Sequence, residues 1–283
     1  MTAGTYFIDE QYRDEEVLRL TEQDQRVTAA MGGVLAEQGD PGLFRHVLDV
    51  ACGVGYWAIE MAQTNPELSL IGIDVDSHMI AAAHAKAATP KLQKRVNFYV
   101  MDALSTLTFS DLSFDLVNLR FGLGFVRTWD WKRLLGDLLR VLRPGGVLRV
   151  TDEEVIHESN SPAARQFYEV LLCALERSGH LFTKESTGLT GHLPELFSQM
   201  GFRQVQTRAY ALQYRAGTPE GQAYIENSLR LLRMVRPFIQ HWGCLPPDYD
   251  AIQRQAHAEA TRPDFAAIWH LLTVWGVRGE QLI

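Results

Sequence analysis

The stretch Val47-Leu-Asp-Val-Ala-Cys-Gly-Val-Gly-Tyr-Trp57 decides the fold of this chain. Residues 47–50 are predicted to form a short buried strand, and residues 57–62 to begin a helix. Between them lies a turn of small residues that includes Ala51, Gly53 and Gly55. A strand that enters a helix through such a turn lets backbone N–H groups approach a ligand closely. The stretch therefore predicts a nucleotide-type binding turn.

Strands and helices continue to alternate beyond this turn. The expected strands are residues 68–75, 96–101, 114–119 and 147–151, and the expected helices are 77–88 and 131–142. This alternation predicts βαβ units, and hence a parallel sheet with helices on both faces. Ahead of the first strand, the acidic run Asp14-Glu15-Glu16 is typical of a helix N-terminus. That helix either packs on the core or forms a cap over a ligand.

The second half of the chain is richer in helices. We expect helices at 162–177, 194–200, 219–240 and 248–262, and strands at 202–210 and 265–277. No Gly/Ser/Pro-rich linker separates these elements from the first half, so the late helices are interpreted as insertions between strands of one sheet. The expected architecture is a single α/β domain over residues 1–283, with a Rossmann-like, seven-stranded, mostly parallel sheet. Its parts are an N-terminal helical cap (1–40), a cofactor-binding core (41–155), helical lid insertions (156–200 and 216–262) and an antiparallel final strand (265–277).

Composition excludes several partner classes. The formal net charge is -7 and no basic run occurs, so the sequence predicts no nucleic-acid partner. Polar residues interrupt every apolar stretch, which predicts no membrane span, and the N-terminus does not resemble a secretory signal. Cys52, Cys173 and Cys244 are odd in number and far apart, which fits neither a disulfide framework nor a zinc site. We therefore expect a reduced, cytoplasmic protein without a metal.

Acidic residues stand at the ends of the first three predicted strands. Asp74 ends the second strand, where a carboxylate can accept both hydroxyls of a ribose; the alternative is a helix-capping acid, a role that Asp76 or Ser77 could also fill. Asp102 follows the third strand and is either a partner for the exocyclic amine of adenine or a plain strand-end acid. A dinucleotide cofactor stays open on spacing alone, because Ala58 occupies the third small position of that fingerprint.

Five motifs in order resemble the class I S-adenosylmethionine-dependent methyltransferases. They are Val47 to Gly55, Gly72-Ile-Asp-Val-Asp76, Asn97-Phe-Tyr-Val-Met-Asp-Ala103, Phe114-Asp-Leu-Val117 and Leu142-Arg-Pro-Gly-Gly146. The narrower resemblance is to the small-molecule methyltransferases of secondary metabolism and quinone biosynthesis. It is carried by Tyr56-Trp-Ala-Ile-Glu-Met-Ala62, Asn118-Leu-Arg-Phe-Gly-Leu-Gly-Phe-Val126 and Leu272-Thr-Val-Trp-Gly276. One departure is Ala51, where this family usually has glycine.

The resemblance implies S-adenosylmethionine as cofactor and a set of contacts to it. Backbone at Ala51, Gly53 and Gly55 would surround its methionine part, with Asp49 as a supporting acid, and Asp74 would hold the ribose. Val75 and Met79 would flank the adenine, Asp102 and Ala103 would meet its amine edge, and backbone near Asn118, Leu119 and Arg120 would face the sulfonium. Tyr12 either lies against the cofactor as a cation–π partner or is ordinary core packing.

Methyl transfer requires a nucleophile held in line, and a base when that nucleophile carries a proton. The predicted bases after the fifth strand are Glu153, Glu154 and His157, with a solvated acidic run as the alternative. Aromatic and apolar residues of the insertions, among them Tyr168, Tyr224 and Leu231, suit a lid over a hydrophobic acceptor, although core burial or a homodimer interface explains them equally well.

The function predicted is methyl transfer to a small aromatic or hydrophobic secondary-metabolite acceptor, and the resemblance favours C- or O-methylation. Two alternatives remain. One is a cofactor-binding scaffold with a pericyclase-like or regulatory role; the other is an NAD-dependent dehydrogenase, disfavoured because no hydride-transfer Tyr-Lys or Ser-Tyr pair is evident.

Overall fold

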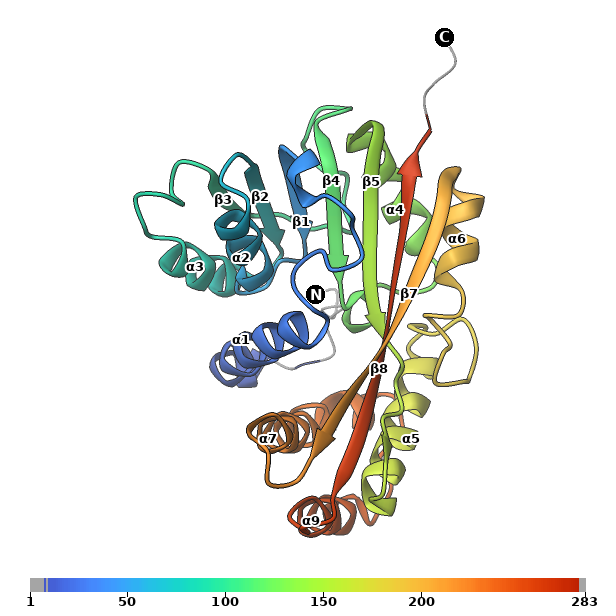
Figure 1. Ribbon diagram of the computed structural model, residues 1–283. Coiled ribbons are helices and arrows are strands. Elements are labelled where there is room, and N and C mark those ends of the chain that lie inside the picture. Colours follow the sequence, from blue (N-terminus) through green and yellow to red (C-terminus); the bar gives the residue numbers. More distant parts are fainter. Residues whose placement is uncertain (1–7, 9, 280–283) are drawn as a thin grey trace.

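The computed structural model describes residue 8 and residues 10–279, and a mixed β-sheet runs through them (Figure 1). The strand order is β3-β2-β1-β4-β5-β8-β6, with β7 paired to β8. Strands β1 to β5 are mutually parallel, and β8 is antiparallel to β5, β6 and β7. The strands are β1 (His46–Val50), β2 (Ser69–Asp74), β3 (Val96–Val100), β4 (Phe114–Arg120), β5 (Leu142–Glu153), β6 (Glu158–Ser159), β7 (Phe202–Arg215) and β8 (Ala266–Arg278).

The predicted Rossmann-like α/β class is confirmed, including the antiparallel final strand. The described sheet has eight strands where seven were expected. The additional strand is β6, a two-residue segment that pairs Glu158 with Ile268 and Ser159 with Ala267. Two residues are too few to show an alternating pattern in the sequence. The strand forms only because β8 extends past the end of β5 and offers a pairing edge there.

Helices cover both faces of the parallel strands. Successive residues of a strand point to opposite faces, so Val47 packs with α2 (Tyr56–Thr64) and α3 (Ser77–Lys86), while Leu48 packs with α4 (Trp131–Val141). The α4 face also includes α6 (Leu193–Gln199), through Phe197. The described residues also form short 3₁₀ helices, namely η1 (Glu10–Tyr12), η2 (Pro41–Leu43) and η3 (Gly122–Gly124).

The long strands β7 and β8 continue past the parallel strands, and helices from the second half of the chain lie around this extension (Figure 1). The helix α5 begins as predicted, since the Ser161 hydroxyl accepts a hydrogen bond from the Ala164 N–H (3.0 Å) and Pro162 follows it. The single helix expected at 219–240 is instead two, because Pro237 lacks an N–H and cannot continue a helix from within. The helices around the extension are α5 (Pro162–Arg177), α7 (Pro219–Met234), α8 (Arg236–His241) and α9 (Tyr249–Ala260).

Helix α1 (Arg13–Ala30) lies below the parallel strands, between the two halves of the molecule (Figure 1). The acidic residues predicted in its first turn are there. Its contacts reach both halves: Asp24 pairs with Arg120 at the end of β4, and Glu22 pairs with Arg230 on α7 (3.1 Å). The predicted helix before the first strand is therefore present, and its role as a cap over a ligand stays a prediction.

The expectation of reduced, unpaired cysteines is wrong for two of the three. Cys173 in α5 and Cys244, shortly after α8, form a disulfide, whereas Cys52 is free and buried. The pair is 71 residues apart in sequence, and only the packing of α5 against α8 brings the two thiols together. The disulfide removes the cysteine argument for a reducing compartment, so the cytoplasmic location stays a prediction.

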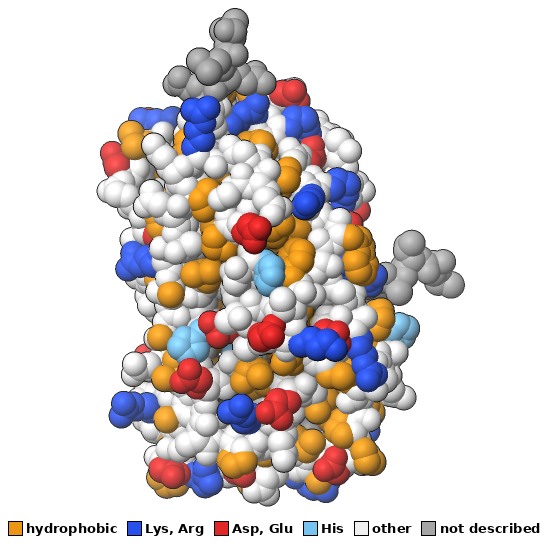
Figure 2. Space-filling model, turned by 90° about the vertical axis from the view of Figure 1, so that its right-hand side faces the viewer, with side chains coloured by type: hydrophobic (Ala, Val, Ile, Leu, Met, Phe, Trp, Pro, Cys, Tyr) orange, Lys and Arg blue, Asp and Glu red, His pale blue; other side chains and the backbone are white. Residues whose placement is uncertain are grey.

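The face of the molecule shown in Figure 2 carries side chains of mixed type. On the face that carries α6 and α5, acidic and basic side chains are interspersed, with hydrophobic side chains between them (Figure 2). Within the described residues, no helix has the length and apolar character that crossing a membrane requires.

Candidate functional site

The turn after β1 has the open backbone that its small residues predict. Ala51, Gly53 and Gly55 have φ values of 52°, 52° and 72°, in the left-handed region that glycine tolerates best. A Cβ at Gly53 would meet nothing within 4 Å, whereas one at Gly55 would lie 2.7 Å from the Phe98 ring. Gly55 thus allows close packing inside the fold, and Gly53 leaves clear space beside the turn. This space fits a ligand that approaches the backbone.

Asp74 closes this turn from the end of β2. Its carboxylate accepts hydrogen bonds from the Gly53 and Asp76 N–H groups, each at 2.9 Å. Burial raises the pKa of Asp74, while these two bonds oppose the rise. The cap of α3 is Asp76, whose carboxylate accepts the His78 N–H at 2.7 Å. The alternative of Asp74 as the helix cap is therefore wrong, and its carboxylate lies at the turn.

The remaining residues predicted around adenine lie at the same edge of the sheet. Val75 is 65% exposed beside Asp74, while Met79 is buried in α3. Asp102 is held in its own turn, where it accepts the Leu104 N–H and the Ser105 hydroxyl, both at 2.8 Å, and Ala103 beside it is buried. Strand β2 pairs with β1 on one side and with β3 on the other, so the three strand ends lie side by side.

A chain of buried polar groups supports the turn from behind. Asp49 accepts a hydrogen bond from the Asn118 amide (2.8 Å), and the Asn118 oxygen accepts one from Arg149 on β5 (2.7 Å). Arg149 in turn pairs with Glu37, at 2.5 Å. Burial raises the pKa of Asp49 to about 7. Burial also acts to raise the pKa of Glu37, but the charge and hydrogen bond of Arg149 bring it below its ordinary value.

Glu37 and Arg149 were missed at the level of sequence. They belong to no motif, and they meet only because the segment before β1 folds back over β5. Their side chains are each 1% exposed, so the charges of this pair are shielded from water.

The end of β4 is tied directly to α1. Arg120 donates to the Thr28 hydroxyl (3.0 Å) and pairs with Asp24. Burial raises the pKa of Asp24, and the charge of Arg120 opposes this rise. Leu119, which precedes Arg120 in β4, is fully buried. Tyr12, just before α1, packs against the hydrophobic cluster on the α4 face, as its core-packing alternative predicts.

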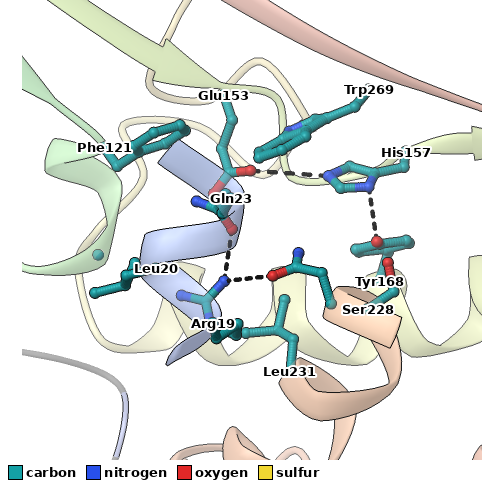
Figure 3. Close-up of a pocket in the computed structure, with 12 residues that line it drawn as sticks. Arg19, Leu20, Gln23, Phe121, Glu153, His157, Tyr168, Ser228, Leu231 and Trp269 are labelled. Carbon is teal, nitrogen blue, oxygen red and sulfur yellow. Dashed lines mark hydrogen bonds and ion pairs between the residues drawn. The ribbon is translucent and has the colours of Figure 1, made fainter. Parts of the chain in front are cut away.

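A pocket opens beside the ends of β4 and β5, where both late helical segments (residues 156–200 and 216–262) reach the cap (Figure 3). The side chain of Glu153 points into it, between the rings of Phe121 and Trp269. The lining residues are Arg19, Leu20 and Gln23 of α1, Phe121 and Gly124 after β4, Glu153 and His157 around the end of β5, Tyr168 of α5, Asn227, Ser228 and Leu231 of α7, and Trp269 of β8.

Aromatic rings form one wall of this pocket. Phe121 stacks on Trp269 with ring centres 5.9 Å apart, and Trp269 lies against the His157 ring at 5.1 Å. Phe121 itself has a φ of 58°, a conformation that costs a residue with a side chain about 1–2 kcal/mol. The surrounding packing, including the contact with Trp269, must offset this cost.

Two of the three predicted bases meet in the pocket. Glu153 and His157 lie 3.8 Å apart, between Oε2 and Nε2. The other ring nitrogen of His157 lies 2.7 Å from the Tyr168 hydroxyl and 2.9 Å from the Tyr224 hydroxyl. Burial lowers the pKa of His157, and Glu153 opposes this change. The third predicted base, Glu154, is not among the residues that line the pocket, and its backbone N–H donates a hydrogen bond to the His270 carbonyl (3.0 Å).

Opposite the aromatic wall, α1 and α7 supply a polar surface that sequence reasoning did not identify. Arg19 is bound by both carboxylate oxygens of Glu16 (2.6 and 2.7 Å), so its charge is balanced within α1. It also donates to Gln23 (2.6 Å) and to Asn227 on α7 (3.2 Å). These residues lie outside the recognised motifs and become neighbours only through packing.

Comparison with known proteins adds independent information. Residues 47–146 match the family model described as a methyltransferase domain. The chain is 36% identical over 155 residues to demethylmenaquinone methyltransferase of Deinococcus radiodurans, a match that covers 53% of this chain and 59% of that protein. It is 31% identical over 176 residues to the Listeria monocytogenes serotype 4a protein of the same name, covering 57% and 71%. The chain thus spans little more than half the length of the first of these relatives.

Among solved structures, phosphoethanolamine N-methyltransferase 2 of Haemonchus contortus, in complex with S-adenosylhomocysteine, superposes with a TM-score of 0.56. That alignment covers 96% of this chain and 58% of the other, at 19% sequence identity. At this identity the likeness establishes the fold alone.

Proposed function

Because the chain belongs to the class I S-adenosylmethionine-dependent methyltransferases, we propose that it transfers a methyl group to a small aromatic acceptor bound in the pocket beside β4 and β5. The observation that carries the proposal is the Glu153 carboxylate, which points between two aromatic rings next to the end of β4. We propose further that residues 1–283 act as one domain, in which residues 1–40 cap a core of 41–155 and the two helical segments close over the acceptor.

The cofactor would lie along the ends of β1, β2 and β3. When bound, S-adenosylmethionine supplies an activated methyl group on a sulfonium. The clear space at Gly53 and the neighbouring Asp74 carboxylate support placement of its methionine and ribose parts there. Asp102 and the exposed Val75 would receive the adenine, with Ala103 and Met79 behind it. Asn118, Leu119 and Arg120 would then bring the end of β4 to the sulfonium.

The acceptor would be a flat, hydroxylated ring. Phe121 and Trp269 provide stacking surface, and the charge of Arg19 is already balanced by Glu16, which disfavours an acceptor that needs a cation as partner. The relatives are named for demethylmenaquinone, so a quinol-like acceptor and methylation at carbon are the favoured choice. The same ring chemistry accommodates O-methylation of a phenol.

Glu153 would remove the hydroxyl proton of the acceptor. A phenol is a poor nucleophile until it loses that proton, and a positioned carboxylate contributes typically 10²- to 10⁴-fold to such a step. The cap and the two helical segments would limit the access of water to the pocket once an acceptor is bound, which would strengthen electrostatic interactions within it.

The test is formation of S-adenosylhomocysteine with a panel of quinol, phenol and indole acceptors. We expect turnover with quinols or phenols, and Glu153→Gln should lower kcat by at least about 100-fold while cofactor affinity changes little. Tight cofactor binding without turnover on any acceptor would favour the scaffold role. Binding of NAD(H) in preference to S-adenosylmethionine, measured by calorimetry, would favour the dehydrogenase.

A further inference from the structure

His157 stands where both helical segments meet the end of β5. Its Nδ1 lies within hydrogen-bond distance of the hydroxyls of Tyr168 on α5 (2.7 Å) and Tyr224 on α7 (2.9 Å), which are 3.5 Å from each other. Its Nε2 faces the Glu153 carboxylate at 3.8 Å (Figure 3). The ring is 6% exposed, so these neighbours decide which nitrogen carries the proton.

The tyrosine hydroxyls can donate hydrogen bonds to Nδ1 in this arrangement. Burial raises the pKa of Tyr168 well above its ordinary value and that of Tyr224 to about 12, so both hydroxyls keep their hydrogens at neutral pH. Burial also lowers the pKa of His157, which disfavours the doubly protonated ring. A neutral imidazole has one donor nitrogen and one acceptor nitrogen, and the tyrosine hydroxyls can supply the hydrogen to an acceptor Nδ1.

The Glu153 carboxylate can only accept a hydrogen bond, so the nitrogen that faces it, Nε2, has to be the donor. If Nδ1 carried the proton, the lone pair of Nε2 would face the negative charge of Glu153, and the two groups would repel each other. With the proton on Nε2, that N–H points to the carboxylate, and Nδ1 accepts from one tyrosine while the second hydroxyl donates to the first. His270 of β8 also acts on this ring, with a charge that lowers the His157 pKa.

We propose that Tyr168 and Tyr224 fix His157 in the tautomer protonated at Nε2, and that His157 thereby acts as a positioning residue that holds Glu153 toward the acceptor. The role of Glu153 rests on the proposed function. In the reaction, the acceptor O–H bond breaks and its proton passes to a Glu153 oxygen. For methylation at oxygen, the electron pair left on that oxygen forms the new bond to the methyl carbon, and the carbon–sulfur bond breaks with its electrons passing to sulfur. For methylation at carbon, the pair shifts through the ring to the carbon that forms this bond. The proton of that carbon then leaves to solvent, and the aromatic ring is restored.

This arrangement ties both helical segments to the end of β5. Tyr168 belongs to one segment and Tyr224 to the other, so the two contacts with Nδ1 require both segments to be packed against His157.

The tautomer can be measured without any acceptor, by long-range ¹H–¹⁵N correlation spectra of protein labelled at histidine, with His157 assigned from a His157→Gln variant. We expect a protonated Nε2 and an unprotonated Nδ1. In the Tyr168→Phe/Tyr224→Phe double variant we expect a mixture of the two tautomers. Tyr214→Phe is the matched control, because Tyr214 stacks on Tyr224 at 4.4 Å and its hydroxyl does not bond His157. It should leave the spectrum unchanged.

Kinetics supply the second readout. With a turned-over acceptor, the double variant should lower kcat by about 10- to 100-fold, less than the loss in Glu153→Gln, with KM within about threefold, and it should displace the acid limb of the kcat–pH profile. A wild-type ring protonated at Nδ1, or a double variant with the wild-type tautomer and pH profile, would overturn the proposal. Absence of turnover with a protonated Nε2 would instead refute the proposed function and leave the tautomer assignment standing.

Discussion

Replacement of Asp49 by asparagine should make the protein more stable at neutral pH. Asp49 is 3% exposed, and burial raises its pKa from 3.8 to about 7. Asparagine has nearly the same shape and keeps an oxygen that can accept the hydrogen bond from Asn118. The substitution therefore removes the titratable charge with little change in packing.

The magnitude follows from linkage. Because the folded protein holds the Asp49 proton more tightly than the unfolded chain, the neutral carboxyl contributes stability that is present below pH 3.8 and is lost as the pH rises through about 7. One pKa unit corresponds to about 1.4 kcal/mol, so the complete loss amounts to about 4 kcal/mol. The Asp49→Asn variant has no such loss. The difference between its unfolding free energy and that of the wild type should therefore grow by about 3 kcal/mol between pH 5 and pH 8.

The assay is urea unfolding of both proteins at several pH values across this range, with the difference in unfolding free energy plotted against pH. Asp248→Asn is the control, because it removes an exposed carboxylate that makes no side-chain cap hydrogen bond to α9. Its difference curve should stay within about 0.5 kcal/mol of zero. A flat curve for Asp49→Asn as well would refute the reasoning, since it would mean that Asp49 is ionised in the folded protein throughout.

Three further predictions concern the turn and the disulfide. Ala51→Gly should raise the unfolding free energy by about 1 kcal/mol, because Ala51 has a φ of 52°; an equal or lower melting temperature would contradict this. Cys173→Ser should lower the unfolding free energy by about 4 kcal/mol under oxidising conditions, since it opens a 71-residue loop. Dithiothreitol should bring the wild type to the same value, and a wild type insensitive to it would count against the cross-link. Asp74→Ala should weaken S-adenosylmethionine binding at least about tenfold in calorimetry, and unchanged affinity would exclude the ribose role.

Much of the fold could be predicted because its signals are local. The small-residue turn after Asp49, the Ser161-Pro162 start of α5 and the alternating apolar strands each reflect the conformational preference of a few adjacent residues. The Cys173–Cys244 disulfide was missed because it depends on how α5 and α8 pack, which no local pattern encodes.

The candidate site likewise contains residues that local sequence patterns predict and residues that only the packing of distant segments brings together. Asp74 and Glu153 could be placed because the ends of parallel strands meet at one edge of a sheet, a rule that needs only the strand boundaries. The Glu37–Arg149 pair and the contact of His157 with Tyr224 join residues that are 112 and 67 positions apart in sequence. Neither has a characteristic spacing, so both required the structure.

Strand β8 constrains how molecules enter and leave the pocket. It hydrogen-bonds to β5 toward its C-terminal end and to β6 near its start, while β7 pairs along its length. A hinge motion between the two halves would have to bend this continuous ribbon, so the halves should move as a unit. Helix α1, in contrast, is joined to α7 only through side-chain contacts such as Arg19–Asn227 and Glu22–Arg230 among those described. We therefore expect acceptor and product to exchange where α1 meets α7, at a rate that depends on ionic strength because the Glu22–Arg230 ion pair lies there.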